Sequence, residues 1–192
     1  MLFRSMGKNT GDVLDVIDTS GVSITKTDAV SEGFGLKGYY TVECYDADGN
    51  LKWSDDIHNL VVTVGKNDML DKYFAGSAYT AAWYMGLVDG ASAPTYAAGD
   101  TLASHAGWTE LAAGTAYTGN RPTVSWSAAS AGSKSSTSTS FSIIASNTVA
   151  GALMATVNTG TAGILFSAGN FTGGSRTVVS GDVLNVTWSI SV

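Results

Sequence analysis

The chain has 192 residues, of which 44% are hydrophobic and 14% are charged, with a formal net charge of −6. This composition excludes intrinsic disorder, because disordered chains are poor in apolar residues and rich in charge. The acidic balance argues against nucleic acid as a partner, since neutralising phosphates requires clustered Lys and Arg. No apolar run reaches the roughly 18 residues of a spanning helix, so we expect no membrane partner.

Residues 1–37 are expected to form an extended N-terminal arm. Their apolar side chains are scattered among Asp, Thr, Ser and Gly without a sustained helical or strand period. Such a segment buries little by itself, so it is either a tail or a strap that folds onto a partner. The candidate partner-binding residues of the arm are its apolar side chains, which are Val13, Leu14, Val16, Ile17, Val22 and Ile24.

Residues 38–192 are expected to form one domain, which opens with a β-hairpin. Residues 39–45 alternate between the two faces of a strand, and the alternation resumes at Leu51. Between them, 46–50 contains an Asp-Gly pair, which is a strong hairpin signal because Gly accepts the positive φ of a tight turn. A further strand is expected at 60–64.

The segment 65–76 predicts the one helix of the chain, near residues 66–75. Asp68 favours the positive N-terminal end, and Gly76 can close the helix with a left-handed cap. Four apolar side chains share one helical face, which predicts that the helix packs on a sheet through them. They are Met69, Leu70, Tyr73 and Phe74.

The rest of the chain is rich in strand formers and poor in charge. Residues 80–88 form a nearly continuous apolar run, which is typical of a strand buried on both faces, and a loop follows at 89–107 with a short strand at 108–111. After Arg121 the only ionisable side chains are Lys134, Arg176 and Asp182. Further strands are expected at 123–127, 137–146, 149–157, 163–166, 175–179 and 183–192. Turn residues separate them at sandwich spacing, so we predict a mainly β fold, an antiparallel β-sandwich of jelly-roll or Ig-like type.

No catalytic, cofactor or metal set emerges from the sequence, so we expect a protein that is not an enzyme. Asp46 to Asn50 lacks the glycine and glutamate positions of a calcium loop. The least favoured alternative is a metal-dependent hydrolase built on Asp56, His58 and His105, for which no further ligand is evident. Cys44 is the single cysteine, which excludes an intrachain disulfide and fits synthesis in a reducing cytoplasm.

The five tryptophans could provide aromatic faces for sugars or partner proteins. Most of them fall in or beside predicted strands and are expected in the core. Trp108 borders the glycine-containing loop 89–107 and is the one expected to be exposed. It is therefore the candidate residue for binding a host-surface glycan or receptor.

A series of motifs follows in a recognisable order. They are YTVECYDADGNLKW at 40–53, HNLVV at 58–62, WYMGLVD at 83–89, AGDTLASHAGWTE at 98–110, NRP at 120–122, LFSAGNFTGG at 165–174 and GDVLNVT at 181–187. The series resembles a family of small virion structural proteins of tailed bacteriophages over about residues 39–192. The resemblance implies a virion component made in the host cytoplasm, whose partners are copies of itself and other virion proteins.

The leading hypothesis is a tail or neck subunit, a fibre or an adaptor, that assembles through its N-terminal arm. The first alternative is a capsid decoration (cement) protein on the head. The second is a receptor- or glycan-binding module that uses Trp108 and the loop 89–107.

Overall fold

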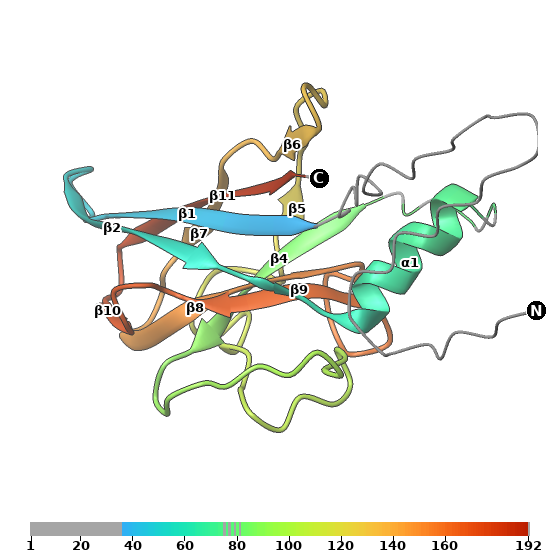
Figure 1. Cartoon of the computed structure of the whole chain (residues 1–192). Helices are drawn as coiled ribbons and strands as arrows, with labels where there is room; N and C mark the ends of the chain where they lie inside the picture. The colour runs from blue at the N-terminus through green and yellow to red at the C-terminus, as the bar shows by residue number, and fades with distance from the viewer. Residues whose placement is uncertain (1–35, 75, 77, 79, 81, 192) are drawn as a thin grey trace, which may run out of the picture. The chain divides into compact units, whose positions relative to one another are not determined.

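The computed structural model describes residues 36–74, 76, 78, 80 and 82–191. They form two antiparallel β-sheets packed face to face, together with one helix, α1 (Figure 1). This confirms the predicted mainly β sandwich with one short helix. The apolar side chains proposed for the arm, from Val13 to Ile24, lie outside the described residues.

The first sheet contains five strands with β11 at its centre. The order is β2-β1-β11-β6, and β7 pairs with β11 beside β6. Side chains of β1 alternate between faces, so that Tyr40, Val42 and Cys44 are fully buried. The strands are β1 (Lys37–Tyr45), β2 (Leu51–His58), β6 (Ser133–Ser135), β7 (Thr139–Ser142) and β11 (Val183–Ser191).

The predicted hairpin is confirmed in β1 and β2. The carboxylate of Asp46 accepts hydrogen bonds from the backbone N–H groups of Asp48 and Asn50, at 3.0 and 2.8 Å. Gly49 has a φ of +83°, the left-handed conformation that the turn requires.

The second sheet contains six strands and is buried on both faces. Its order is β3-β9-β8-β4-β5, and β10 pairs with β8. One face packs against the first sheet, and the other is covered by the segment 90–121 through Leu102, Trp108 and neighbouring residues. The strands are β3 (Leu60–Val61), β4 (Trp83–Asp89), β5 (Thr123–Val124), β8 (Asn147–Ala155), β9 (Leu165–Asn170) and β10 (Arg176–Val178).

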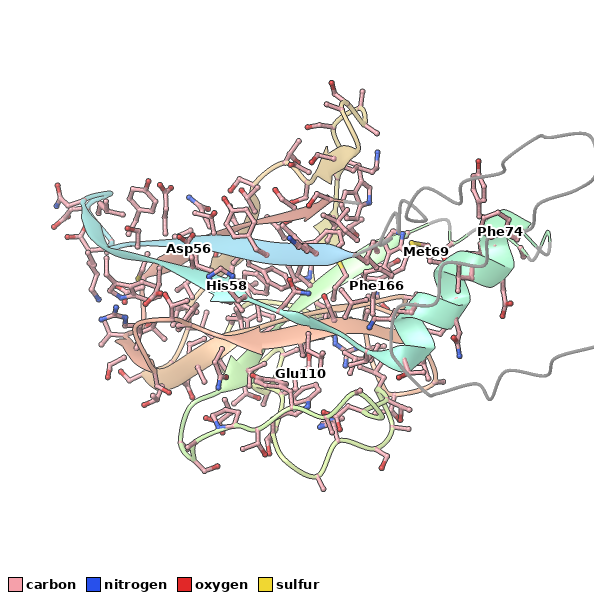
Figure 2. The ribbon with its side chains drawn as sticks, viewed as in Figure 1. Asp56, His58, Met69, Phe74, Glu110 and Phe166 are labelled. Atoms are coloured by element: carbon pink, nitrogen blue, oxygen red, sulfur yellow. The ribbon has the colours of Figure 1, made fainter. Side chains whose placement is uncertain are left out.

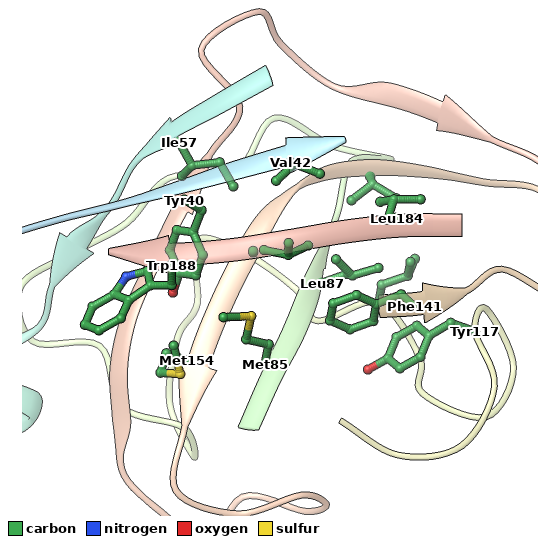
Figure 3. Packing of buried hydrophobic residues seen from close by; sticks show 14 of the residues in the cluster. Tyr40, Val42, Ile57, Met85, Leu87, Tyr117, Phe141, Met154, Leu184 and Trp188 are labelled. Carbon is green, nitrogen blue, oxygen red and sulfur yellow. The ribbon is translucent and has the colours of Figure 1, made fainter. Parts of the chain in front are cut away.

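The main core fills the space between the two sheets (Figure 3). Aromatic and aliphatic side chains interdigitate there, with Tyr117 and Phe141 meeting edge to face at 5.1 Å between ring centroids. One buried hydrogen bond joins the sheets, between the hydroxyls of Tyr40 in β1 and Ser167 in β9, at 2.8 Å. Burial raises the pKa of Tyr40 far above its usual value, so the phenol stays neutral.

Tyr40→Phe is expected to lower the free energy of unfolding by about 1–3 kcal/mol, because the fully buried hydroxyl of Ser167 loses its partner. Urea denaturation followed by circular dichroism measures the change. The matched control is Tyr39→Phe, at a neighbouring position that is 44% exposed, where we expect a change within about 0.5 kcal/mol. Equal stability of the two variants would contradict a structural role for the bond.

The helix α1 (Thr63–Phe74) is confirmed, but it begins earlier than predicted and packs differently. The strand expected at 60–64 ends as β3 at Val61, because the chain turns into the helix at Thr63. The first turn lies close to β9: a Cβ on Gly65 would be 2.6 Å from the carbonyl oxygen of Phe166. The helix then extends past the end of the sheets (Figure 1).

The expectation that four side chains of α1 pack on a sheet is wrong for three of them. Met69 packs against the core, whereas Leu70, Tyr73 and Phe74 are 44%, 81% and 78% exposed. Figure 2 shows Met69 near the sandwich and Phe74 at the far end of the helix. Only the first half of the helix faces the sheets.

The expected strands beyond residue 100 are present with different bounds: β11 lies almost as predicted, β8 is shifted by two residues, β9 is longer than expected, and the others are shorter or divided. The strand at 108–111 is reduced to a single bridge between Val88 and Glu110. The serine-rich run 133–140, which lacks an apolar alternation, contributes β6 and part of β7. The hydroxyls of Ser135 and Ser189 pair across the sheet at 2.8 Å, so this edge of the sheet is joined by polar side chains.

Candidate functional site, an apolar cleft at the helix end of the sandwich

Trp108, expected to be exposed, is buried and only 5% exposed. Its indole N–H donates to a carboxylate oxygen of Asp100 at 3.0 Å, and its ring stacks on His105 at 3.8 Å between centroids. The sequence expectation is wrong because the outer face of the second sheet is apolar and the segment carrying Trp108 covers it. The glycan-binding alternative thereby loses the aromatic face on which it depends.

The acidic and histidine residues considered for metal binding do not form a metal site. Asp56 and His58 lie exposed on the outer side of β2 (Figure 2), and a ring nitrogen of His105 lies 3.0 Å from the carbonyl oxygen of Trp108. Within residues 36–74 and 82–191, no three His, Cys, Asp or Glu side chains gather as a metal ion would need.

Asp55, beside these residues, is a structural carboxylate. Its side chain is 4% exposed and accepts a hydrogen bond from Arg176 Nη2 at 2.8 Å. Thr172 and the backbone N–H of Gly173 also donate to it. Burial alone would raise the pKa of Asp55, but these hydrogen bonds outweigh burial and hold the pKa below its usual value.

The lowered pKa of Asp55 predicts a pH-dependent contribution to stability. A group with a depressed folded-state pKa stabilises the fold above its unfolded pKa, about 3.9 for Asp, and this stabilisation is lost as pH falls through the folded value. We expect the stability gap between the wild type and Asp55→Asn to be constant above about pH 5 and to shrink below about pH 4. Denaturation from pH 7 to pH 3 measures the gap. A gap that widens on acidification would contradict this assignment, and Arg176→Gln should weaken the pH dependence.

An apolar cleft opens between the ends of the two sheets, beside the helix. Its volume is about 220 Å³, and we call it the tryptophan cleft. Each sheet contributes lining strands, and α1 contributes Met69. The other lining residues are Trp83, Trp126, Lys134, Met154, Phe166, Trp188 and Ile190.

The aromatic rings of the tryptophan cleft are held by one another. Phe166 meets Trp83 and Trp188 edge to face, at 5.3 and 5.7 Å between ring centroids. Trp126 meets Trp188 in the same manner at 5.5 Å. Such edge-to-face pairs fix ring orientation, so the walls of the cleft are pre-formed.

Among the residues that the structure describes, Lys134 is the one charged residue that lines the tryptophan cleft. Its ammonium donates to the carbonyl oxygen of Ser127 at 2.8 Å and lies 5.8 Å from the centre of the Trp126 ring. It forms no salt bridge with any residue that the structure describes. The cleft therefore combines apolar walls with a cation that lacks an acidic partner there.

The far end of α1, beyond Met69, carries further apolar side chains that are exposed. Tyr73 lies one helical turn after Met69, on the same face, and its ring contacts that of Phe74 at 4.9 Å between centroids. Leu70 adds a third exposed apolar side chain. Large apolar side chains exposed together on one element are typical of interaction sites in soluble proteins.

Comparison with known proteins adds no assignment. No protein-family model matches the chain, and no curated protein matches it. None of the described helices is long and apolar enough to cross a membrane. The tryptophan cleft and the exposed end of α1 are therefore the features that bear on function.

Proposed function

We propose that the chain is a non-enzymatic structural subunit of a tailed-phage particle, a fibre or adaptor of the tail or neck that assembles through its N-terminal arm. The observation that carries the proposal is the apolar surface formed by the tryptophan cleft and the end of α1. Its shape and composition suit polypeptide contacts.

The exposed aromatics are the strongest support. Tyr73 and Phe74 are 81% and 78% exposed, whereas the other exposed large apolar side chains of the described residues are 44–55% exposed. Obligate interfaces between subunits resemble a domain core cut in half, so these side chains suit a surface that is covered on assembly. The motif order that resembles virion proteins supports the same class of function.

The experiment is to purify particles carrying the full chain or a variant that lacks residues 1–34, and to count copies by quantitative mass spectrometry. The truncation keeps Leu36, which packs against the core. We expect a dozen or so copies of the full chain per particle and loss of the truncated chain from particles, with its circular dichroism spectrum unchanged.

Each of the other possible outcomes of this experiment leads to a different conclusion. Hundreds of copies would support the alternative of a head decoration protein. Normal incorporation of the truncated chain would contradict assembly through the arm. Absence of the full chain from particles would contradict the virion assignment itself.

A further inference from the structure

We propose that the tryptophan cleft of one copy binds residues 13–17 from the N-terminal arm of a second copy. The inference rests on the proposed function, because a particle subunit needs contacts that link one copy to the next. The tryptophan cleft would be the site that receives the arm, and residues 13–17 would be the part of the arm that enters it.

The position at which the chain enters the domain supports this assignment. Leu36 packs against the core, and Lys37 pairs with Ser191 at the beginning of β1. The preceding residue of β11, Ile190, lines the tryptophan cleft. The 35 residues before Leu36 thus join the domain at the edge of the cleft.

The length of the arm is compatible with binding to a second copy. An extended chain spans about 3.3 Å per residue, so the 20 residues from Ile17 to Lys37 cover up to about 66 Å. The radius of gyration of a domain of this size is about 15 Å. An arm that leaves one copy beside its own cleft is therefore long enough to span to the cleft of an adjacent copy.

The charges of the arm and of the cleft are complementary. The arm sequence DVLDVID at 12–18 places two apolar pairs between three aspartates, and no basic residue occurs from 9 to 25. Lys134 at the cleft has no acidic partner among the described residues, and Lys37 lies at the neighbouring strand end. A second apolar part of the arm, Leu2 and Phe3, is followed by Arg4, which Lys134 would repel, and a third, Val22 and Ile24, has no adjacent carboxylate.

The volume of the cleft matches the side chains of residues 13–17. An apolar cavity of about 150 Å³ is large enough to hold benzene, so the tryptophan cleft, at about 220 Å³, suits a Val or Ile side chain with part of its neighbour. Residues 13–17 supply such side chains in adjacent pairs, with a carboxylate between them for Lys134. Burial of the apolar side chains and an ion pair between Asp15 and Lys134 would then both stabilise the bound arm.

Disulfide capture between two full-length variants tests the proposal. One copy carries Ile17→Cys, and the other carries Met69→Cys inside the cleft; the native Cys44 is buried. The matched control replaces Met69→Cys with Ala47→Cys, in the exposed turn between β1 and β2 at the opposite end of the sandwich (Figure 1). After mild oxidation of an equimolar mixture, we expect a mixed dimer with Met69→Cys at about ten times the yield with Ala47→Cys.

Exchanging the charges of Lys134 and Asp15 provides a second test, again measured by the yield of mixed dimer. Lys134→Glu in the cleft copy should lower the yield of mixed dimer about tenfold, because it places a carboxylate against Asp15. Asp15→Lys in the arm copy should restore the yield. Ile190→Cys repeats the capture on a strand if Met69→Cys unfolds the helix.

Three results would overturn the proposal. The first is equal dimer yield at the cleft and control positions. The second is an internal disulfide in the doubly substituted chain without mixed dimer, which would show that each arm occupies its own cleft. The third is preferential capture of Phe3→Cys. The capture experiment uses purified protein and does not depend on particles. A mixed dimer from a chain that is absent from particles would disprove only the proposed function. A chain that is present in particles but forms no mixed dimer would disprove only this inference.

Discussion

Gly151→Ala is expected to prevent the chain from folding, or to lower its free energy of unfolding by more than about 4 kcal/mol. Gly151 lies in β8, where an added Cβ would be 1.8 Å from the carbonyl oxygen of Gly169 in β9. No real contact is that short, and the opposing atom belongs to backbone paired in the middle of the second sheet. The strands could accommodate the methyl group only by separating.

Soluble yield, circular dichroism and denaturant midpoint measure this effect. Gly99→Ala is the matched control, because a Cβ at Gly99 has no atom within 4 Å and its φ is not in the left-handed region. That control should be as stable as the wild type or gain up to about 1 kcal/mol. A Gly151→Ala protein with wild-type stability would show that β8 and β9 do not approach as closely as described.

Arg121→Ala is expected to cost about 3–5 kcal/mol of stability, because it leaves a largely buried carboxylate without its cation. The Nε and Nη2 groups of Arg121 donate to the two carboxylate oxygens of Glu110 at 2.7 and 2.6 Å. Its Nη1 donates to the carbonyl oxygens of Val157 and Gly160 at 3.0 and 3.1 Å. The Arg121 side chain is 5% exposed and that of Glu110 is 21% exposed, so one guanidinium joins the covering segment to the end of β8.

Two further variants make the test of Arg121 specific. Lys72→Ala removes the cation of an ion pair with Asp68 one turn away on α1, and such helix pairs contribute only about 0.3–0.5 kcal/mol. The double variant Glu110→Leu with Arg121→Met removes both charges and should recover part of the loss. If Arg121→Ala cost no more than Lys72→Ala in urea denaturation, the ion pair would not hold the covering segment.

The sequence predicted the parts of the fold that depend on local chemistry. The Asp-Gly turn at Gly49 and the helix ahead of Gly76 are examples, and both glycines adopt the positive φ that those roles require. The sandwich class followed from the strand spacing after Arg121. The exact strand ends did not, because pairing partners set them: β6 exists through its pairing with β11 rather than through its own serine-rich composition.

The burial of Trp108 could have been inferred from a signal that the sequence does contain. The apolar run at 80–88 predicts a strand buried on both faces, and one partner sheet covers only one face. Another part of the chain was therefore required to cover the opposite face of this strand. The segment after β4 covers it, and Trp108 belongs to the resulting apolar cluster. A loop that looks open in sequence is thus part of a second core.

The tryptophan cleft could not be predicted in the same way. Its rings come from Trp83, Trp126 and Trp188, far apart in the chain, and only the register of both sheets brings them together. The sequence did contain one indication of an interaction surface, in the helix. The apolar residues of α1 extend to Tyr73 and Phe74, beyond the part of the helix that contacts the sheets. That excess of apolar surface is typical of an element that has a partner.

The most direct test of assembly through the arm and the tryptophan cleft is a density map of intact particles in which this chain is located. We expect copies in a ring or trimer of the tail or neck, with the cleft of each copy filled by polypeptide from the arm of its neighbour. A map in which the chain is present and its cleft faces open solvent would contradict this account.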